Sequence, residues 1–135
     1  MKTLTVEAHI NNLSKVLDFI DSELDNSSCS RKTLMQINIA VEELFANVAS
    51  YAYPMRTGGI SIDVEVESDP GKVTITFTDS GIPYNPLLRE DPDITLPAEE
   101  RSIGGLGVFI VKETMDNMTY ERKDDHNIVT ISKHF

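Results

Sequence analysis

The sequence has very little cysteine and no long apolar run, and both absences restrict where the protein acts. Cys29 is the only cysteine among the 135 residues, so no disulfide can form within the chain. No stretch approaches the roughly 20 apolar residues that a membrane-spanning helix needs, and no charged and then apolar leader opens the chain. We therefore expect a cytoplasmic protein without a membrane anchor, in which Cys29 is an ordinary thiol and not a nucleophile.

Basic residues are also scarce. Twelve Lys and Arg stand against 22 Asp and Glu, which gives a net charge of -10. This sign is wrong for a protein that binds nucleic acid by neutralising its phosphates, so no direct nucleic acid partner is expected. The same charge repels a free nucleotide, so a phosphate site would need a cation or a focused local field.

The pattern of apolar residues predicts one domain, residues 1–135, with strands and helices in a definite order. Period-two alternation predicts five strands, and helical spacing predicts three helices. The strands are expected at 2–9, 60–68, 72–79, 118–123 and 127–135, and the helices within 11–28, from about 31 to 53, and within 104–116. This order indicates an α+β protein, a two-layer α/β sandwich whose mixed, mostly antiparallel sheet is covered on one face by three helices.

Glu43 and Asn47 lie four residues apart in the central predicted helix, so their side chains share one face. On a helical wheel they fall nearly opposite the apolar stripe centred on Val41. A solvated polar edge is the simpler interpretation of such a pair. A ligand site is the alternative, because small residues beside the pair leave room for one: Ala40, Ala46 and Ser50.

Two further motifs are ambiguous when taken singly. Asp79 ends a predicted strand, and Gly81 then lets the backbone turn or a flat ligand approach, although Asp-Ser-Gly also suits an ordinary turn. Gly104, Gly105 and Gly107 open a predicted helix, where exposed backbone N–H groups favour phosphate. This second motif is neither a P-loop nor a dinucleotide-binding fingerprint.

Together and in this order, Glu43-x-x-x-Asn47, Asp79-x-Gly81 and Gly104-Gly105-x-Gly107 resemble the N, G1 and G2 boxes of the GHKL ATPase superfamily, which includes gyrase B and histidine kinases. The short chain and the stretches NVASYAY, FTDSGIPYNP and LPAEERSIGGLGVFIVKETMD are similar to the anti-sigma-factor serine/threonine protein kinases of bacterial partner-switching systems. The resemblance runs from the first predicted strand to the end. Two positions depart from it: Pro83 replaces a frequent second glycine, and Tyr51 stands where a histidine is common.

The resemblance implies a site for ATP and Mg²⁺. It assigns Asn47 to a magnesium ion that bridges the phosphates, which agrees with the preference of Mg²⁺ for a few hard oxygen ligands from the protein. It assigns Glu43 to the general base that polarises the attacking hydroxyl. Asp79 would accept a hydrogen bond from the adenine amino group, and Gly81 would give the ring room.

At the phosphate end, the resemblance assigns backbone N–H groups of Gly104, Gly105 and Gly107 to the phosphates, and residues 82–103 to an ATP lid. The proline-rich segment from residue 80 to 103 has few apolar anchors, which is typical of a functional loop. Arg101 stands where related kinases carry a phosphate-facing arginine and would stabilise the charge of phosphoryl transfer. An exposed lid arginine without a catalytic role is the alternative.

The implied function is that of an ATP-binding serine/threonine protein kinase and anti-sigma factor. It would transfer the γ-phosphate of ATP to an anti-sigma-factor antagonist protein, with a sigma factor as a second partner and a homodimer as the family's assembly. Two alternatives stay open: a nucleotide-gated binding module with little phosphoryl transfer, and the ATP-binding domain of a histidine-kinase-like signalling system. The three boxes do not identify a sigma factor, because they do not encode partner surfaces.

Overall fold

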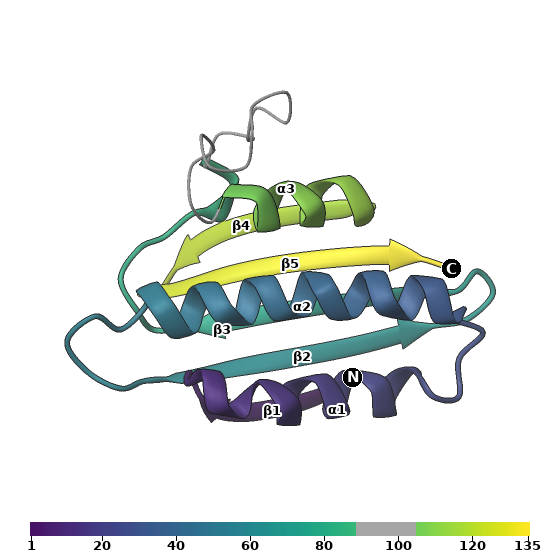
Figure 1. Ribbon diagram of the computed structural model, residues 1–135, viewed down its shortest axis with the longest axis horizontal. Coiled ribbons are helices and arrows are strands. Elements are labelled where there is room, and N and C mark those ends of the chain that lie inside the picture. The colour runs from purple at the N-terminus through teal and green to yellow at the C-terminus, as the bar shows by residue number, and fades with distance from the viewer. Residues whose placement is uncertain (89–104) are drawn as a thin grey trace.

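The computed structural model describes residues 1–88 and 105–135, which form one sheet with helices on one face (Figure 1). The elements in chain order are β1 (Lys2–Glu7), the 3-10 turn η1 (Ile10–Asn12), α1 (Leu13–Leu24), α2 (Arg31–Tyr51), β2 (Gly59–Glu67), β3 (Lys72–Asp79), the 3-10 turn η2 (Pro86–Leu88), α3 (Gly105–Thr114), β4 (Asn117–Lys123) and β5 (His126–His134). The five strands are ordered β1-β2-β3-β5-β4, and all four pairings are antiparallel. The predicted α+β class is confirmed, with a fully antiparallel sheet in the described residues.

The alternation that predicted the strands places apolar side chains on the face that the helices cover. Every second residue of β3 is buried, beginning at Val73. Phe77 pairs with Ile62 of β2 and with Val129 of β5, so three strands contribute apolar side chains at one level of the sheet. At the end of β3, Asp79 instead lies opposite Asn127, and the apolar inner face therefore ends in a polar pair.

α2 crosses the middle of the sheet, and its start was predicted correctly. The Ser30 side chain accepts a hydrogen bond from the backbone N–H of Thr33 at 3.2 Å, which is the expected N-terminal cap. The helical wheel was wrong about Asn47, which is buried and only 9% exposed. The reason is that Asn47 lines a cavity closed by other elements, including Tyr84, Pro86 and Asn127, whereas the wheel considered only the apolar stripe of α2 itself.

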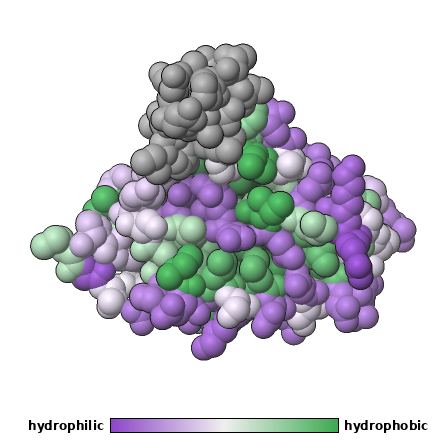
Figure 2. Space-filling model, viewed as in Figure 1, coloured by the Kyte–Doolittle hydropathy of each residue, from purple (hydrophilic) through white to green (hydrophobic). Residues whose placement is uncertain are grey.

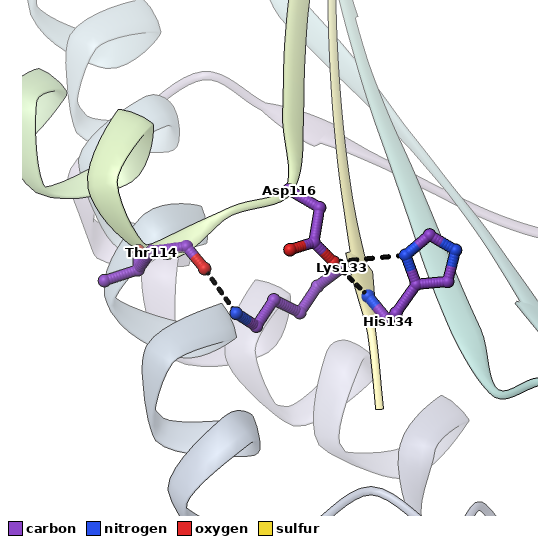
Figure 3. Close-up of polar contacts among 4 residues, drawn as sticks. All are labelled: Thr114, Asp116, Lys133 and His134. Carbon is purple, nitrogen blue, oxygen red and sulfur yellow. Dashed lines mark hydrogen bonds and ion pairs between the residues drawn. The ribbon is translucent and has the colours of Figure 1, made fainter.

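The C-terminal end of α3 is tied to β5 by polar contacts (Figure 3). Lys133 Nζ donates a hydrogen bond to the carbonyl oxygen of Thr114 at 2.7 Å, which satisfies a carbonyl at the end of the helix. The backbone N–H of His134 donates to Asp116 Oδ2 at 2.6 Å, and this bond is the main reason that the pKa of Asp116 is lowered. These contacts fix one end of α3 while its other end, at Gly105 and Gly107, faces α2.

The helix-covered face is partly apolar. Figure 2 shows apolar side chains gathered across the middle of this face, between hydrophilic regions. Met35 and Ile39 of α2 are 59% and 47% exposed. Among the described residues, no helix combines the length and the apolar character that crossing a membrane requires.

Candidate functional site

The ends of three elements meet at one end of the sheet and form a cavity. These are the C-terminal ends of α2 and β3 and the start of β5, which lie on the same side in Figure 1. The cavity is lined mostly by apolar side chains together with three buried polar ones: Leu44, Asn47, Val48, Ala52, Phe77, Asp79, Tyr84, Pro86, Asn127 and Val129. An apolar pocket with a few fixed polar groups is the usual form of a small-molecule site.

The cavity is narrow in this conformation. Its free space is about 20 Å³, which holds about one water molecule. Tyr84 and Pro86, from the segment after β3, form part of its wall, and the Tyr84 ring stacks on Tyr51 of α2 with 5.7 Å between the ring centroids. A ligand larger than water therefore requires part of the cavity wall to move outward. Tyr51, a departure from the usual motif, supplies one face of this aromatic stack.

Asp79 is held in a fixed orientation at the base of the cavity. The residue is 5% exposed, and its Oδ1 accepts hydrogen bonds from the backbone N–H of Gly81 and from Nδ2 of Asn127, both at 2.9 Å. The other oxygen, Oδ2, accepts no hydrogen bond from the residues that the structure describes. Asp79 thus keeps one acceptor for the donor of a ligand.

Asn127 is a site residue that the sequence reasoning missed. It is 3% exposed and lines the cavity beside Asp79, although no motif contains it. One signal was present in the sequence: Asn127 shares the inward face of its strand with Val129 and Ile131, and a polar residue in such a row requires a hydrogen-bonding partner. The alternation alone does not say that the partner is Asp79.

Asn47 lines the same cavity from α2. Its side-chain nitrogen, Nδ2, is buried and finds no hydrogen-bond partner within residues 1–88 and 105–135. A buried donor without a partner costs about 1–3 kcal/mol. Such a group is expected where a ligand supplies the missing acceptor, for example a phosphate oxygen.

The side chains present fit a magnesium ion that is held mainly by a ligand. The described residues contain no group of three or more His, Cys, Asp or Glu side chains that would hold a metal by themselves. Mg²⁺ bound with a nucleotide usually takes one or two ligands from the protein and the rest from phosphates and water. An amide oxygen from Asn47, at the edge of the cavity, suits that coordination.

Glu43 lies one turn of α2 before Asn47 and contacts the start of α3. A Cβ atom added to Gly107 would overlap the Glu43 carboxylate, so the glycine is what allows the first turn of α3 to approach it. The N-terminus of a helix carries a partial positive charge, which favours a carboxylate or a phosphate there. The structure therefore brings together Glu43 and Gly107, which belong to separate motifs of the sequence.

Gly81 allows the turn after β3 to pack closely against the end of α2. A Cβ atom at this position would overlap the backbone and side chain of Ala52, and the N–H of Ile82 donates to the Ala52 carbonyl oxygen at 2.9 Å. The glycine thus lets the turn after β3 pack against the end of α2, and its role toward an adenine ring stays a prediction. Arg101, Gly104 and the predicted lid beyond residue 88 lie outside the described residues.

Cys29 has no features of a reactive thiol. It is half-buried before α2, and burial raises the pKa of its thiol above the ordinary value. A thiol with a raised pKa is less often in the nucleophilic thiolate form. This finding agrees with the expectation that Cys29 is an ordinary thiol.

Comparison with known families and sequences gives one family for nearly the whole chain. Residues 6–133 match the model of the histidine kinase-like ATPase domain. The serine/threonine-protein kinase BtrW of Bordetella bronchiseptica is 22% identical over 107 residues, which cover 78% of this chain and 73% of that protein. The match to the family extends over the elements that form the cavity.

Solved structures with the same fold include bacterial signalling proteins. The RsbU and RsbW domains of Rv1364c from Mycobacterium tuberculosis match 98% of this chain with a TM-score of 0.64 and 13% identity. The histidine kinase domain of the blue-light activated histidine kinase from Erythrobacter litoralis matches 92% of it with a TM-score of 0.56 and 17% identity. This chain spans 32% of the mycobacterial chain and 59% of the Erythrobacter chain, so these likenesses concern the fold.

Proposed function

The chain belongs to the histidine kinase-like ATPase domain family, and on this premise we propose that it binds ATP with Mg²⁺ and transfers the γ-phosphate to a serine or threonine of a partner protein. The observation that carries the proposal is the position of Asn47. It lines the cavity with Asp79 and lies one turn of α2 from Glu43, against which the start of α3 packs. In this proposal the base site and the phosphate site adjoin along one helix.

The base of the nucleotide would occupy the cavity, with its exocyclic amino group toward Asp79. Oδ2 of this carboxylate has no hydrogen bond from the described residues, whereas Oδ1 has two. The apolar walls formed by Leu44, Phe77 and Val129 suit a flat aromatic ring. Because the free space is small, we propose that the segment at Tyr84 and Pro86 moves outward when the nucleotide enters.

The phosphates would lie toward Asn47 and the start of α3. The Asn47 amide and the backbone N–H groups of Gly104, Gly105 and Gly107 would hold them, and Arg101 would add positive charge from the lid. A magnesium ion bound with the nucleotide would neutralise charge on the phosphate oxygens. In this arrangement Glu43 would accept the proton of the partner's hydroxyl while that oxygen attacks the γ-phosphorus and ADP leaves.

The partner that we propose is an anti-sigma-factor antagonist protein, with a sigma factor as the second partner and a homodimer as the assembly. Support comes from the sequence resemblance described above and from the likeness to a serine/threonine-protein kinase. The -10 net charge supports a protein partner in preference to nucleic acid. The cytoplasm, where such partners act, is the proposed location.

A second candidate function is a nucleotide-gated binding module with little phosphoryl transfer. The contact between Glu43 and the start of α3 favours it, because this carboxylate already occupies a position suited to an anion. In that case ATP would act by changing the arrangement of α2 and α3. The two candidates differ in whether Glu43 takes part in a chemical step.

Calorimetric titration with ATP, with and without Mg²⁺, tests the nucleotide site. We expect binding that depends on Mg²⁺ and that Asn47→Ala weakens about tenfold or more, because the substitution removes a buried polar group that faces the ligand. Asn38→Ala, the same change elsewhere on α2, is the control and should bind ATP like the wild type. Absence of ATP binding by the folded wild type would refute the proposal.

Transfer of labelled phosphate from ATP to a panel of antagonist proteins tests the chemistry. The kinase proposal predicts transfer by the wild type, transfer reduced by about a hundredfold or more in Glu43→Gln, and ATP binding retained in that variant. Glu42→Gln, at the adjacent exposed position, is the control. ATP binding by the wild type with no labelled antagonist would support the binding module.

A further inference from the structure

Asn127 uses all four of its side-chain hydrogen-bonding positions within the site. Its Nδ2 donates to Asp79 Oδ1 at 2.9 Å and to the Ile82 carbonyl oxygen at 2.8 Å. Its Oδ1 accepts from the Tyr120 hydroxyl at 2.6 Å and from the backbone N–H of Tyr84 at 3.3 Å. A carbonyl can only accept and a backbone N–H can only donate, so these neighbours determine which end of the amide is nitrogen.

This fixed amide restricts Asp79. With the Asn127 amide on one side and the Gly81 N–H on the other, Oδ1 is already engaged and rotation of the carboxylate would break both bonds. Rotation is costly because the pair is buried, and a buried polar group that loses its partner is destabilising. Oδ2 therefore remains the acceptor that Asp79 presents to the cavity.

We propose that Asn127 is a positioning residue that sets the preference of the cavity for an adenine base, acting through Asp79, with Tyr120 holding the amide in place. This inference rests on the proposed nucleotide-binding function. Adenine carries an amino donor at the six position, whereas guanine carries a carbonyl oxygen there. A fixed carboxylate oxygen accepts a hydrogen bond from the amino group of adenine and repels the carbonyl oxygen of guanine.

Asn127 contributes to this preference in a second way. Both of its N–H groups are engaged, one by Asp79 and the other by the Ile82 carbonyl oxygen, so it offers no donor to a guanine oxygen. If the amide turned over, its oxygen would face the Ile82 carbonyl oxygen and Asp79 Oδ1, which can only accept hydrogen bonds, so the rotation is opposed. The hydroxyl of Tyr120, at 2.6 Å from Oδ1, can donate or accept, so it holds the amide in position while the acceptor-only neighbours determine which end is nitrogen.

The inference is tested by calorimetry with ATP, GTP and purine riboside triphosphate, which lacks the six-amino group. The wild type should prefer ATP to both other nucleotides. Asn127→Leu should reduce the preference for ATP over purine riboside triphosphate about tenfold, because an unfixed carboxylate recognises the amino group less well. Asn117→Leu, the same change at an exposed position of β4, should leave all three affinities unchanged.

Tyr120→Phe is the second variant and keeps the test decisive if Asn127→Leu does not fold. It removes the hydroxyl that donates to Asn127 Oδ1 and should reduce the preference for ATP over purine riboside triphosphate several-fold, because the amide and the Asp79 carboxylate are then held less firmly. Equal weakening of ATP and purine riboside triphosphate in folded Asn127→Leu would mean a merely structural role and would overturn the inference. Unchanged nucleotide preferences in Tyr120→Phe would also overturn the inference, as would a wild type that binds the three nucleotides with equal affinity. A wild type that binds none of the three refutes the proposed function itself.

Discussion

Gly107→Ala is expected to destabilise the protein, although alanine is the better helix former. In an unconstrained helix interior, replacing glycine by alanine gains about 1 kcal/mol. At this position, however, the added Cβ would overlap the Glu43 carboxylate, so α2 and α3 must separate or Glu43 must leave its rotamer. Overpacking of this kind costs about 1–3 kcal/mol. The net change should therefore be a loss of about 0–2 kcal/mol in the free energy of unfolding.

The test is a double-mutant cycle with Glu43→Ala, because removing the carboxylate removes the overlap. In the Glu43→Ala background, Gly107→Ala should stabilise the protein by up to about 1 kcal/mol, so the sign of the effect reverses. Urea unfolding monitored by circular dichroism measures each free energy. Glu42→Ala provides the control background, in which the effect of Gly107→Ala should equal that in the wild type. Stabilisation by Gly107→Ala in the wild type would refute the close approach of α3 to Glu43.

Two further predictions concern stability away from the cavity. The pKa of Asp116 is lowered chiefly by the backbone N–H of His134. The ionised carboxylate therefore stabilises the folded protein above the pKa of Asp in the unfolded chain, about 4, and this stabilisation is lost as the pH falls through the lower pKa of the folded state. Asp116→Asn should therefore cost at most about 1 kcal/mol at pH 7, because the group is exposed, and less near pH 3. Urea unfolding that gives the same difference in the free energy of unfolding at both pH values would contradict this prediction. Asp125 has a φ of 63° in the turn between β4 and β5, so Asp125→Gly should stabilise the protein by about 0.5 kcal/mol. Asp25→Gly is the matched control at a φ of -60° and should destabilise the protein by a similar amount. Thermal unfolding compares the two variants, and stability changes of equal sign would refute the argument from backbone strain.

The elements of the fold were predictable because their signals are local. β3 alternates inward and outward residues over its full length, and the cap of α2 at Ser30 is written in the sequence as a serine before an apolar-periodic stretch. The last two strands were predicted at 118–123 and 127–135, and Asp124 and Asp125 between them both have positive φ values, as a type I′ turn requires. Each of these features depends on residues that are close in sequence, so the pattern alone was sufficient.

The arrangement of the site was only partly predictable because its pairs are distant in sequence. Asp79 and Gly107 were identified by motif, but the neighbours that give them their positions, Asn127 and Glu43, come from other elements. The burial of Asn47 depends on residues of other elements that line the same cavity, such as Tyr84 and Asn127, which a helical wheel for α2 cannot include. Alternation shows which face a residue occupies, and it does not show which strand or helix will lie against that face.

The charge of the site explains why magnesium should matter for nucleotide affinity. The cavity wall contains Asp79 and no lysine or arginine among its described residues, and Glu43 adds a second carboxylate beside Asn47. The net charge of the chain is -10, and the favourable groups that we assign to a triphosphate in the described part of the site are the start of α3 and the Asn47 amide. In the proposed function, the remaining positive charge would come from a cation bound with the nucleotide or from Arg101 of the predicted lid. We therefore expect a nucleotide affinity that depends steeply on Mg²⁺, because Asp79 and Glu43 would place a carboxylate at each end of the proposed site.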